Sequence, residues 1–151
     1  MITVHLKIPP PVLTLIALFI MYVCTYLLPL WQFKPSWLIA ILLIIIAIVV
    51  GFLAVLALVK SDTTISPFLP QQTARLVTRG IYQYSRNPMY VSLLLVLIAA
   101  IFIYGELSTI LGIVIFMLVV NHYQIKPEEN ILLQLFGEEY ARYCHRVRRW
   151  F

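Results

Sequence analysis

The sequence predicts an all-α integral membrane bundle with about four transmembrane helices and a C-terminal amphipathic helix at the membrane interface. Three observations support this fold class: 62% of the 151 residues are hydrophobic, only 11% are charged, and the apolar residues fall into long runs. A soluble domain carries about 25% charged residues, so the bilayer is the expected solvent. We expect one domain, 1–151, with two spans in 1–60 and a loop, a helical hairpin and the C-terminal helix in 61–151.

Four apolar runs define the expected spans: 12–30, 37–59, 89–104 and 107–120. A helix needs about 20 residues to cross the hydrocarbon, with a range of about 17–25. The first two runs reach this length alone, and flanking polar residues extend the last two into a tight hairpin. We expect Glu106 at the exposed tip of its turn. The first run could instead be a signal peptide, but we expect a span, because the run is long and lacks a small-residue cleavage pattern before Trp31.

Helix boundaries follow from capping residues and prolines. Ser36 is expected to cap the second span and Asn87, before Pro88, the third. Pro127 is expected to begin the C-terminal helix. There, apolar and aromatic residues recur every three or four positions, which predicts an amphipathic helix at the membrane surface, interrupted at Gly137.

The placement of cations predicts the topology. With four spans, Lys34 alone falls on one side, and the other ten of the eleven Lys and Arg residues fall on the side of both termini. Cytoplasmic loops carry the excess of Lys and Arg, so both termini and the polar segments should be cytoplasmic. We expect Arg142, Arg146, Arg148 and Arg149 to face the membrane surface. No soluble basic face exists to bind nucleic acid.

Two polar blocks, 76–90 and 127–143, are separated by the apolar hairpin. The hairpin should return Glu128 and Glu129 to the surface where Asn87 and Tyr90 begin the third span. Such a site could bind a zwitterionic ligand on one side and a lipophilic ligand on the other. Acidic residues are also common in the first turn of a helix for structural reasons alone. Neither cysteine has the partners of a metal site, so we expect no metal.

The two blocks contain short motifs in a fixed order. They are Leu76-Val77 with Gly80 and Tyr82, then Arg86-Asn87-Pro88 and Tyr90, then Glu128-Glu129, and finally Phe136-Gly137 with Tyr140 and Tyr143. Over about residues 63–148 this order resembles the isoprenylcysteine carboxyl methyltransferase and phospholipid methyltransferase superfamily of integral membrane enzymes. The resemblance does not extend to the first two spans.

The resemblance implies a methyltransferase that uses S-adenosylmethionine and releases S-adenosylhomocysteine, with its donor site at the cytosolic face. It implies donor contacts from Arg75, Leu76, Val77, Tyr82, Asn87, Met89, Tyr90, Glu128 and Glu129. Asn87 replaces the histidine of the prenylcysteine enzymes, and an amide cannot act as an acid or base near neutral pH. No glycine-rich nucleotide loop is present, so helix ends and loops must build the site.

The acceptor side is expected at His122 and Gln124, as a base or hydrogen-bonding groups. The acceptor could be a thiol, a lipid amine or a prenylcysteine-like carboxylate on a lipophilic molecule. Gln124 stands where the prenylcysteine enzymes carry an arginine for the substrate carboxylate, which disfavours the last class. The alternative function is a non-catalytic membrane protein that binds a lipid or small amphiphile.

Overall fold

The computed structural model describes residues 8–61 and 75–151, and within these ranges the protein is all-α. The predicted fold class is confirmed. The β-type pairing within these ranges is one isolated antiparallel bridge between Gln32 and Glu106. The elements are α1 (Pro10–Leu27), α2 (Trp37–Val59), the 3₁₀-helix η2 (Gly80–Gln83), α3 (Pro88–Tyr104), the 3₁₀-helix η3 (Leu107–Thr109), α4 (Ile110–Val120), the π-helix η4 (Asn121–Ile125) and α5 (Lys126–Arg146).

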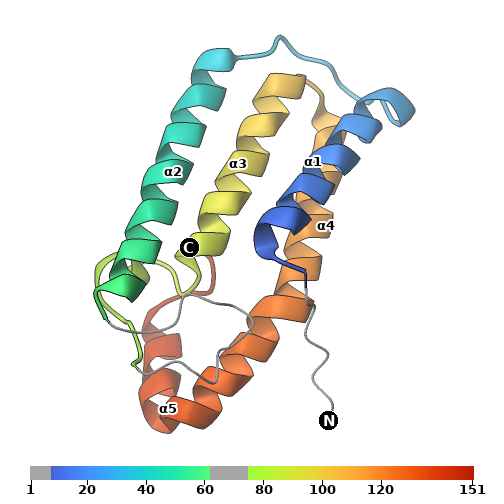
Figure 1. Ribbon diagram of the computed structural model, residues 1–151. Helices are drawn as coiled ribbons and strands as arrows, with labels where there is room; N and C mark the ends of the chain where they lie inside the picture. Colours follow the sequence, from blue (N-terminus) through green and yellow to red (C-terminus); the bar gives the residue numbers. More distant parts are fainter. Residues whose placement is uncertain (1–7, 62–74) are drawn as a thin grey trace.

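Among the described residues, three helices are long and apolar enough to cross a membrane: α1, α2 and the continuous helix Leu107–Arg146 that contains α4 and α5. The fourth expected span, α3, is an apolar helix of 17 residues. These helices lie side by side, with α2, α3 and the α1–α4 pair arranged across the molecule (Figure 1). The apolar runs therefore identified all four helices of the bundle.

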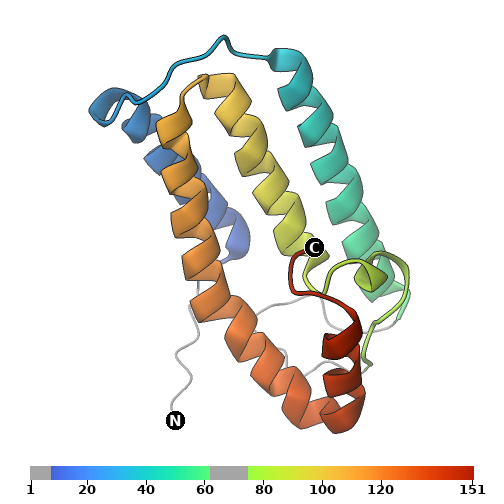
Figure 2. The same cartoon turned by 180° about the vertical axis from the view of Figure 1, so that it is seen from behind.

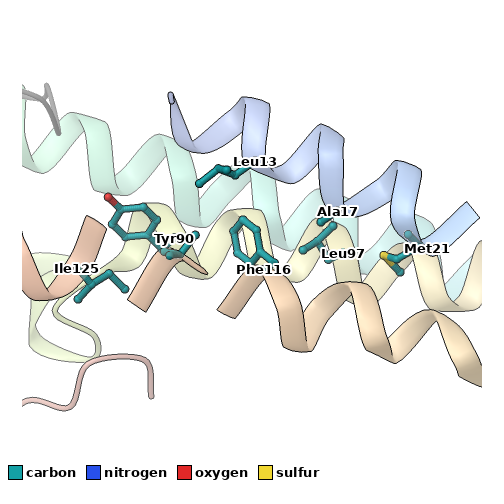
Figure 3. Close-up of a cluster of buried hydrophobic side chains, with 9 residues drawn as sticks. Leu13, Ala17, Met21, Tyr90, Leu97, Phe116 and Ile125 are labelled. Atoms are coloured by element: carbon teal, nitrogen blue, oxygen red, sulfur yellow. The ribbon is translucent and has the colours of Figure 1, made fainter. Parts of the chain in front are cut away.

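The core is filled from α1, α3 and α4. Met21 and Leu97 are fully buried, and Phe116 is almost so; they lie in one row along the bundle (Figure 3). Gly112 of α4 permits close packing, because a Cβ there would overlap the side chain of Met21 on α1. Small residues allow helices to approach closely where lipid supplies no hydrophobic driving force.

Glu106 is buried, contrary to the expectation of an exposed tip. It follows Gly105, which ends α3 in a left-handed conformation (φ 64°), and is only 2% exposed. Its carboxylate accepts hydrogen bonds from the backbone N–H groups of Leu30 (2.8 Å) and Trp31 (3.1 Å). The loop between α1 and α2 covers the tip of the hairpin, so Glu106 joins two loops and does not face solvent.

Pro127 lies in the first turn of α5, but it does not begin a separate helix, which is what the sequence predicted. The chain continues from α4 through the π-helical turn η4 into α5 without a break. A π-turn shifts the register of the backbone hydrogen bonds and commonly accompanies a helix bend, which lets the helix pass the missing N–H of Pro127. Ser36 and Asn87 do occupy N-cap positions, but neither side chain makes a capping hydrogen bond.

The predicted interruption at Gly137 is confirmed. This residue adopts φ 50° and ψ −124° inside α5, a conformation that glycine adopts readily and other residues rarely. The helix reverses there, so that its second half runs back toward the bundle and the C-terminus lies beside the start of α3 (Figures 1 and 2). The reversal brings the last residues of the chain against the first polar block.

Candidate functional site

The two polar blocks meet at a contact between Tyr90 and Glu128. Tyr90 lies in the first turn of α3 and is 6% exposed. Its hydroxyl donates to the carboxylate of Glu128, in the first turn of α5, and lies 3.3 Å from each carboxylate oxygen. The hairpin formed by α3 and α4 therefore returns the second block to the first, as the sequence predicted.

The carboxyl group of Glu128 lies in an unusual electrostatic environment. It lies beyond Val120, where the apolar stretch of the long helix ends. Burial raises the pKa of Glu128 to about 8; the hydrogen bond from Tyr90 opposes this shift and the neighbouring charge of Glu129 adds to it. Within residues 8–61 and 75–151, no ion pair joins Glu128 to a cation. A carboxyl group of this kind is suited to a cationic ligand, whose charge would offset its own.

Tyr82 completes the buried polar group. It lies in η2, is largely buried, and interacts electrostatically with Glu128 and Tyr143. Burial is the main cause of the raised pKa of its phenol. The Tyr143 hydroxyl donates to the backbone oxygen of Tyr82 at 2.6 Å, which attaches η2 to the second half of α5. We call Tyr82, Tyr90 and Glu128 the tyrosine–glutamate cluster.

Glu129 has a different role from its neighbour. Arg149 donates to both of its carboxylate oxygens, at 3.0 and 2.6 Å, and Arg86 forms an ion pair with it at 3.1 Å. Such two-pronged arginine–carboxylate contacts fix geometry strongly. Glu129 therefore joins α5, the first polar block and the C-terminus. The expectation that Arg149 only faces the membrane surface is wrong.

The C-terminal segment 147–150 acts through its backbone as well. The carbonyl of Arg149 accepts hydrogen bonds from Ser85 Oγ (3.2 Å) and Asn87 Nδ2 (3.0 Å). The carbonyl of Arg148 accepts from the backbone N–H of Arg86 (3.0 Å). These three bonds hold the residues that precede α3. The side chain of Asn87 is thus used to bind the C-terminus.

Comparison with known proteins identifies the family. Residues 36–139 match the phospholipid methyltransferase family. This range is more than half of the chain. The chain belongs to the phospholipid methyltransferase family. An uncharacterized protein of Haemophilus influenzae is 50% identical over 62 residues, which are 41% of this chain and 98% of that relative. The resemblance drawn from the polar motifs is confirmed. The match also includes α2, so the expectation that the resemblance would not extend to the first two spans is wrong for the second span.

The phospholipid methyltransferase match contains the whole tyrosine–glutamate cluster, from α2 to the beginning of the second half of α5. Arg149, which holds Glu129, lies beyond it. No motif indicated this residue, because an arginine in a basic tail has the same sequence signature as a membrane-surface anchor. The carbonyl groups that bind Ser85 and Asn87 carry no sequence signal at all.

The other residues expected to hold the methyl donor lie in several places. Leu76 packs against the cluster formed by Tyr140, Tyr143 and Val147. Val77 lines a cavity beside α2. Arg75 is exposed, and Met89 is partly buried in the first turn of α3.

The two residues expected on the acceptor side lie in the π-turn η4. His122 is exposed, and its ring packs edge-on against Tyr123. Gln124 is buried, and its amide nitrogen donates to the carbonyl of Ile8 before α1 at 2.7 Å. Its Oε1 is buried and has no hydrogen-bond partner in the described part of the chain. Gln124 lies one helical turn before Glu128, a spacing that brings side chains to neighbouring positions on a helix.

Proposed function

We propose that this protein transfers a methyl group from S-adenosylmethionine to a lipophilic acceptor, and that the tyrosine–glutamate cluster binds the donor. Membership of the phospholipid methyltransferase family supports methyl transfer to a lipid. The observation that carries the placement of the donor is Glu128: its buried carboxyl is hydrogen-bonded by a phenol and paired with no cation among the described residues.

The chemistry of the cluster fits the donor. S-adenosylmethionine carries a sulfonium and an ammonium group, an adenine and a carboxylate. The Glu128 carboxylate would offset positive charge, and the faces of Tyr82 and Tyr90 can pack against the cation and the adenine. The start of α3, at Met89 and Tyr90, provides a helix N-terminus, which favours the carboxylate of the ligand.

Each residue of the framework then has a physical task. The bound donor supplies an electrophilic methyl group, and the reaction is an in-line displacement at its carbon. Tyr90 orients Glu128 and favours its ionised form through the hydrogen bond. Glu129, held by Arg86 and Arg149, fixes α5 relative to the start of α3. Because alignment of donor and acceptor supplies much of the rate, rigid placement of these helix ends matters more than an acid or base on the donor side.

The acceptor side is proposed at Gln124 and His122. The free Oε1 of Gln124 can accept a hydrogen bond from an N–H or O–H group, and it would repel a carboxylate. This property favours a lipid amine or a thiol over a prenylcysteine-like carboxylate. An amine must lose its proton before transfer, and the imidazole of His122, in the same π-turn as Gln124, could accept it.

The site is proposed to face the cytosol. Arg86 and Arg149 pair with Glu129, next to the tyrosine–glutamate cluster, and Lys126 begins α5. The loop between α1 and α2, which contains Lys34, lies at the opposite end of the bundle (Figure 1). An excess of Lys and Arg marks the cytoplasmic side.

Donor binding and methyl transfer can be tested separately. The protein purified into lipid nanodiscs is titrated calorimetrically with S-adenosylmethionine and S-adenosylhomocysteine, and we expect both to bind. Incubation with methyl-labelled donor and fractionated lipid extract should yield a labelled lipid. Arg148→Ala is a control, because its side chain is exposed and its backbone carbonyl is retained. Folded protein that binds neither compound would refute the proposal and support a non-catalytic lipid-binding protein.

A further inference from the structure

A cavity lies between the C-terminal end of α2 and the segment that contains η2. Its volume is about 520 Å³, within the range of about 300–1,000 Å³ typical of ligand pockets. The green end of α2 and the yellow-green segment after residue 75 lie side by side there (Figure 1). The lining residues are Leu53, Leu56, Ala57, Lys60 and Ser61 from α2 and its end, and Val77, Arg79, Gly80, Ile81 and Tyr84 from the other segment.

This cavity is separate from the tyrosine–glutamate cluster. In a 3₁₀-helix, residues three apart share a face. Ile81 and Tyr84 are three apart and both line the cavity, while Tyr82, between them, is buried and interacts with Glu128. The segment at η2 therefore has the cavity on one side and the cluster on the other.

The lining is amphipathic along the direction of α2. Leu53, Leu56 and Ala57 belong to a helix whose 23 residues carry no charge. Lys60 follows the last residue of that helix, and Arg79 lies across the cavity; both side chains are exposed. None of the described lining residues is acidic. An apolar wall thus ends in two cations at the level where the apolar helix ends.

We propose that this cavity binds a phospholipid of the bilayer, with its phosphate between Lys60 and Arg79 and an acyl chain along the end of α2. Two features select this occupant: Lys60 and Arg79 lie where the apolar helix α2 ends, and the rest of the α2 wall, formed by Leu53, Leu56 and Ala57, is apolar. A free phosphate would use the cations and leave the apolar wall exposed to water. The inference does not depend on methyl transfer, because neither Tyr90 nor Glu128 lines the cavity.

The test uses an anionic phospholipid with a photoreactive acyl chain, in nanodiscs of zwitterionic lipid. After irradiation, mass spectrometry of peptides should locate labels at 53–61 and 77–84. Each juxtamembrane cation contributes about a fivefold change in affinity for an anionic surface. The double variant Lys60→Ala/Arg79→Ala should therefore need about thirtyfold more probe for half-saturated labelling.

Three controls make the result decisive. The charge-conserving variant Lys60→Arg/Arg79→Lys should label like the natural protein, and so should Arg142→Ala/Arg148→Ala, which removes two exposed cations elsewhere. A photoreactive diacylglycerol, which lacks the phosphate, should label the cavity weakly. Equal labelling by diacylglycerol, labels spread evenly over the apolar surfaces of α1, α2 and α4, or an unchanged double variant that remains folded would each overturn the proposal.

Discussion

Replacing Glu128 by glutamine should weaken donor binding and stabilise the protein at the same time. Glutamine keeps the size of the side chain and can still accept the hydrogen bond from Tyr90, but it removes the ionisable group. Replacing a residue that serves only as structural support would instead lower the stability of the protein. Opposite changes in binding and stability are therefore characteristic of a carboxylate retained for a ligand.

The expected change in stability follows from the pKa of Glu128, which is about 8 in the folded protein against an ordinary value of 4.5. Because the folded state favours the protonated form, its stability falls as pH rises from about 4.5 to about 8. The full difference is about 5 kcal/mol at about 1.4 kcal/mol per pKa unit, as an upper bound. Glu128→Gln removes this loss, so the variant should exceed the natural protein in unfolding free energy most clearly at pH 8.

The affinity for the donor should change with pH in the opposite direction to the stability of the protein. A cationic donor favours the ionised carboxylate, so its affinity should rise about tenfold per pH unit between about pH 5.5 and 7.5, with release of about one proton. Glu128→Gln should abolish this slope. Loss of one partner of a buried charge pair costs at least about 2 kcal/mol, so affinity at pH 7.5 should fall at least about thirtyfold.

Calorimetry in nanodiscs measures both quantities. Titrations at pH 5.5, 6.5 and 7.5, each in two buffers of different ionisation enthalpy, give the affinity and the number of protons released. Arg148→Ala, whose side chain is exposed, should retain the slope. If Glu128→Gln binds with the same pH slope and proton release as the natural protein, the donor does not meet this carboxylate and the assignment of the site is wrong.

Three further substitutions test the framework, each by its unfolding free energy in detergent. Arg149→Gln removes the two hydrogen bonds to Glu129 and should cost about 1–2 kcal/mol; no loss would show that the C-terminus does not hold α5. Tyr143→Phe removes the 2.6 Å bond to the Tyr82 carbonyl and should cost about 1 kcal/mol, with weaker donor binding; unchanged values would mean that η2 is held by packing alone. Gly105→Ala places a Cβ against a loop carbonyl at φ 64° and should cost roughly 1–3 kcal/mol without changing donor affinity; a stable variant would contradict the tight outer turn.

The helical bundle could be predicted because the hydrocarbon core of the bilayer determines which segments can cross it. A polar residue inside a span is costly, so an uninterrupted apolar run such as 37–59 has the same limits as α2. Turns follow different rules. Glu106 resembles any charged turn residue, and its burial depends on the N–H groups of Leu30 and Trp31, which belong to a distant loop. Pro127 likewise appeared to begin a helix, because the preceding π-turn has no pattern in side-chain polarity.

The meeting of Tyr90 and Glu128 was predictable for a geometric reason: a two-helix hairpin returns its ends to the same membrane surface. The contacts of the last residues were not. Asn87 was expected to cap α3, yet its side chain binds the backbone carbonyl of Arg149. Side-chain preferences indicate what a residue can bond, whereas the choice of partner depends on where Gly137 reverses the chain.

Glu128 and Glu129 are adjacent in sequence, and their different surroundings explain why the pair is useful. Successive helical residues point about 100° apart, so Glu129 reaches two arginines while Glu128 reaches Tyr90. Arg86 and Arg149 are thus engaged by Glu129 and do not neutralise Glu128. If Glu129 were absent, either arginine would be free to pair with Glu128. The charge of the Glu128 carboxylate would then be neutralised within the protein, and a cationic ligand would bind it less favourably. If the proposed donor site is right, Glu129 would contribute to donor binding indirectly, by keeping the two arginines away from Glu128.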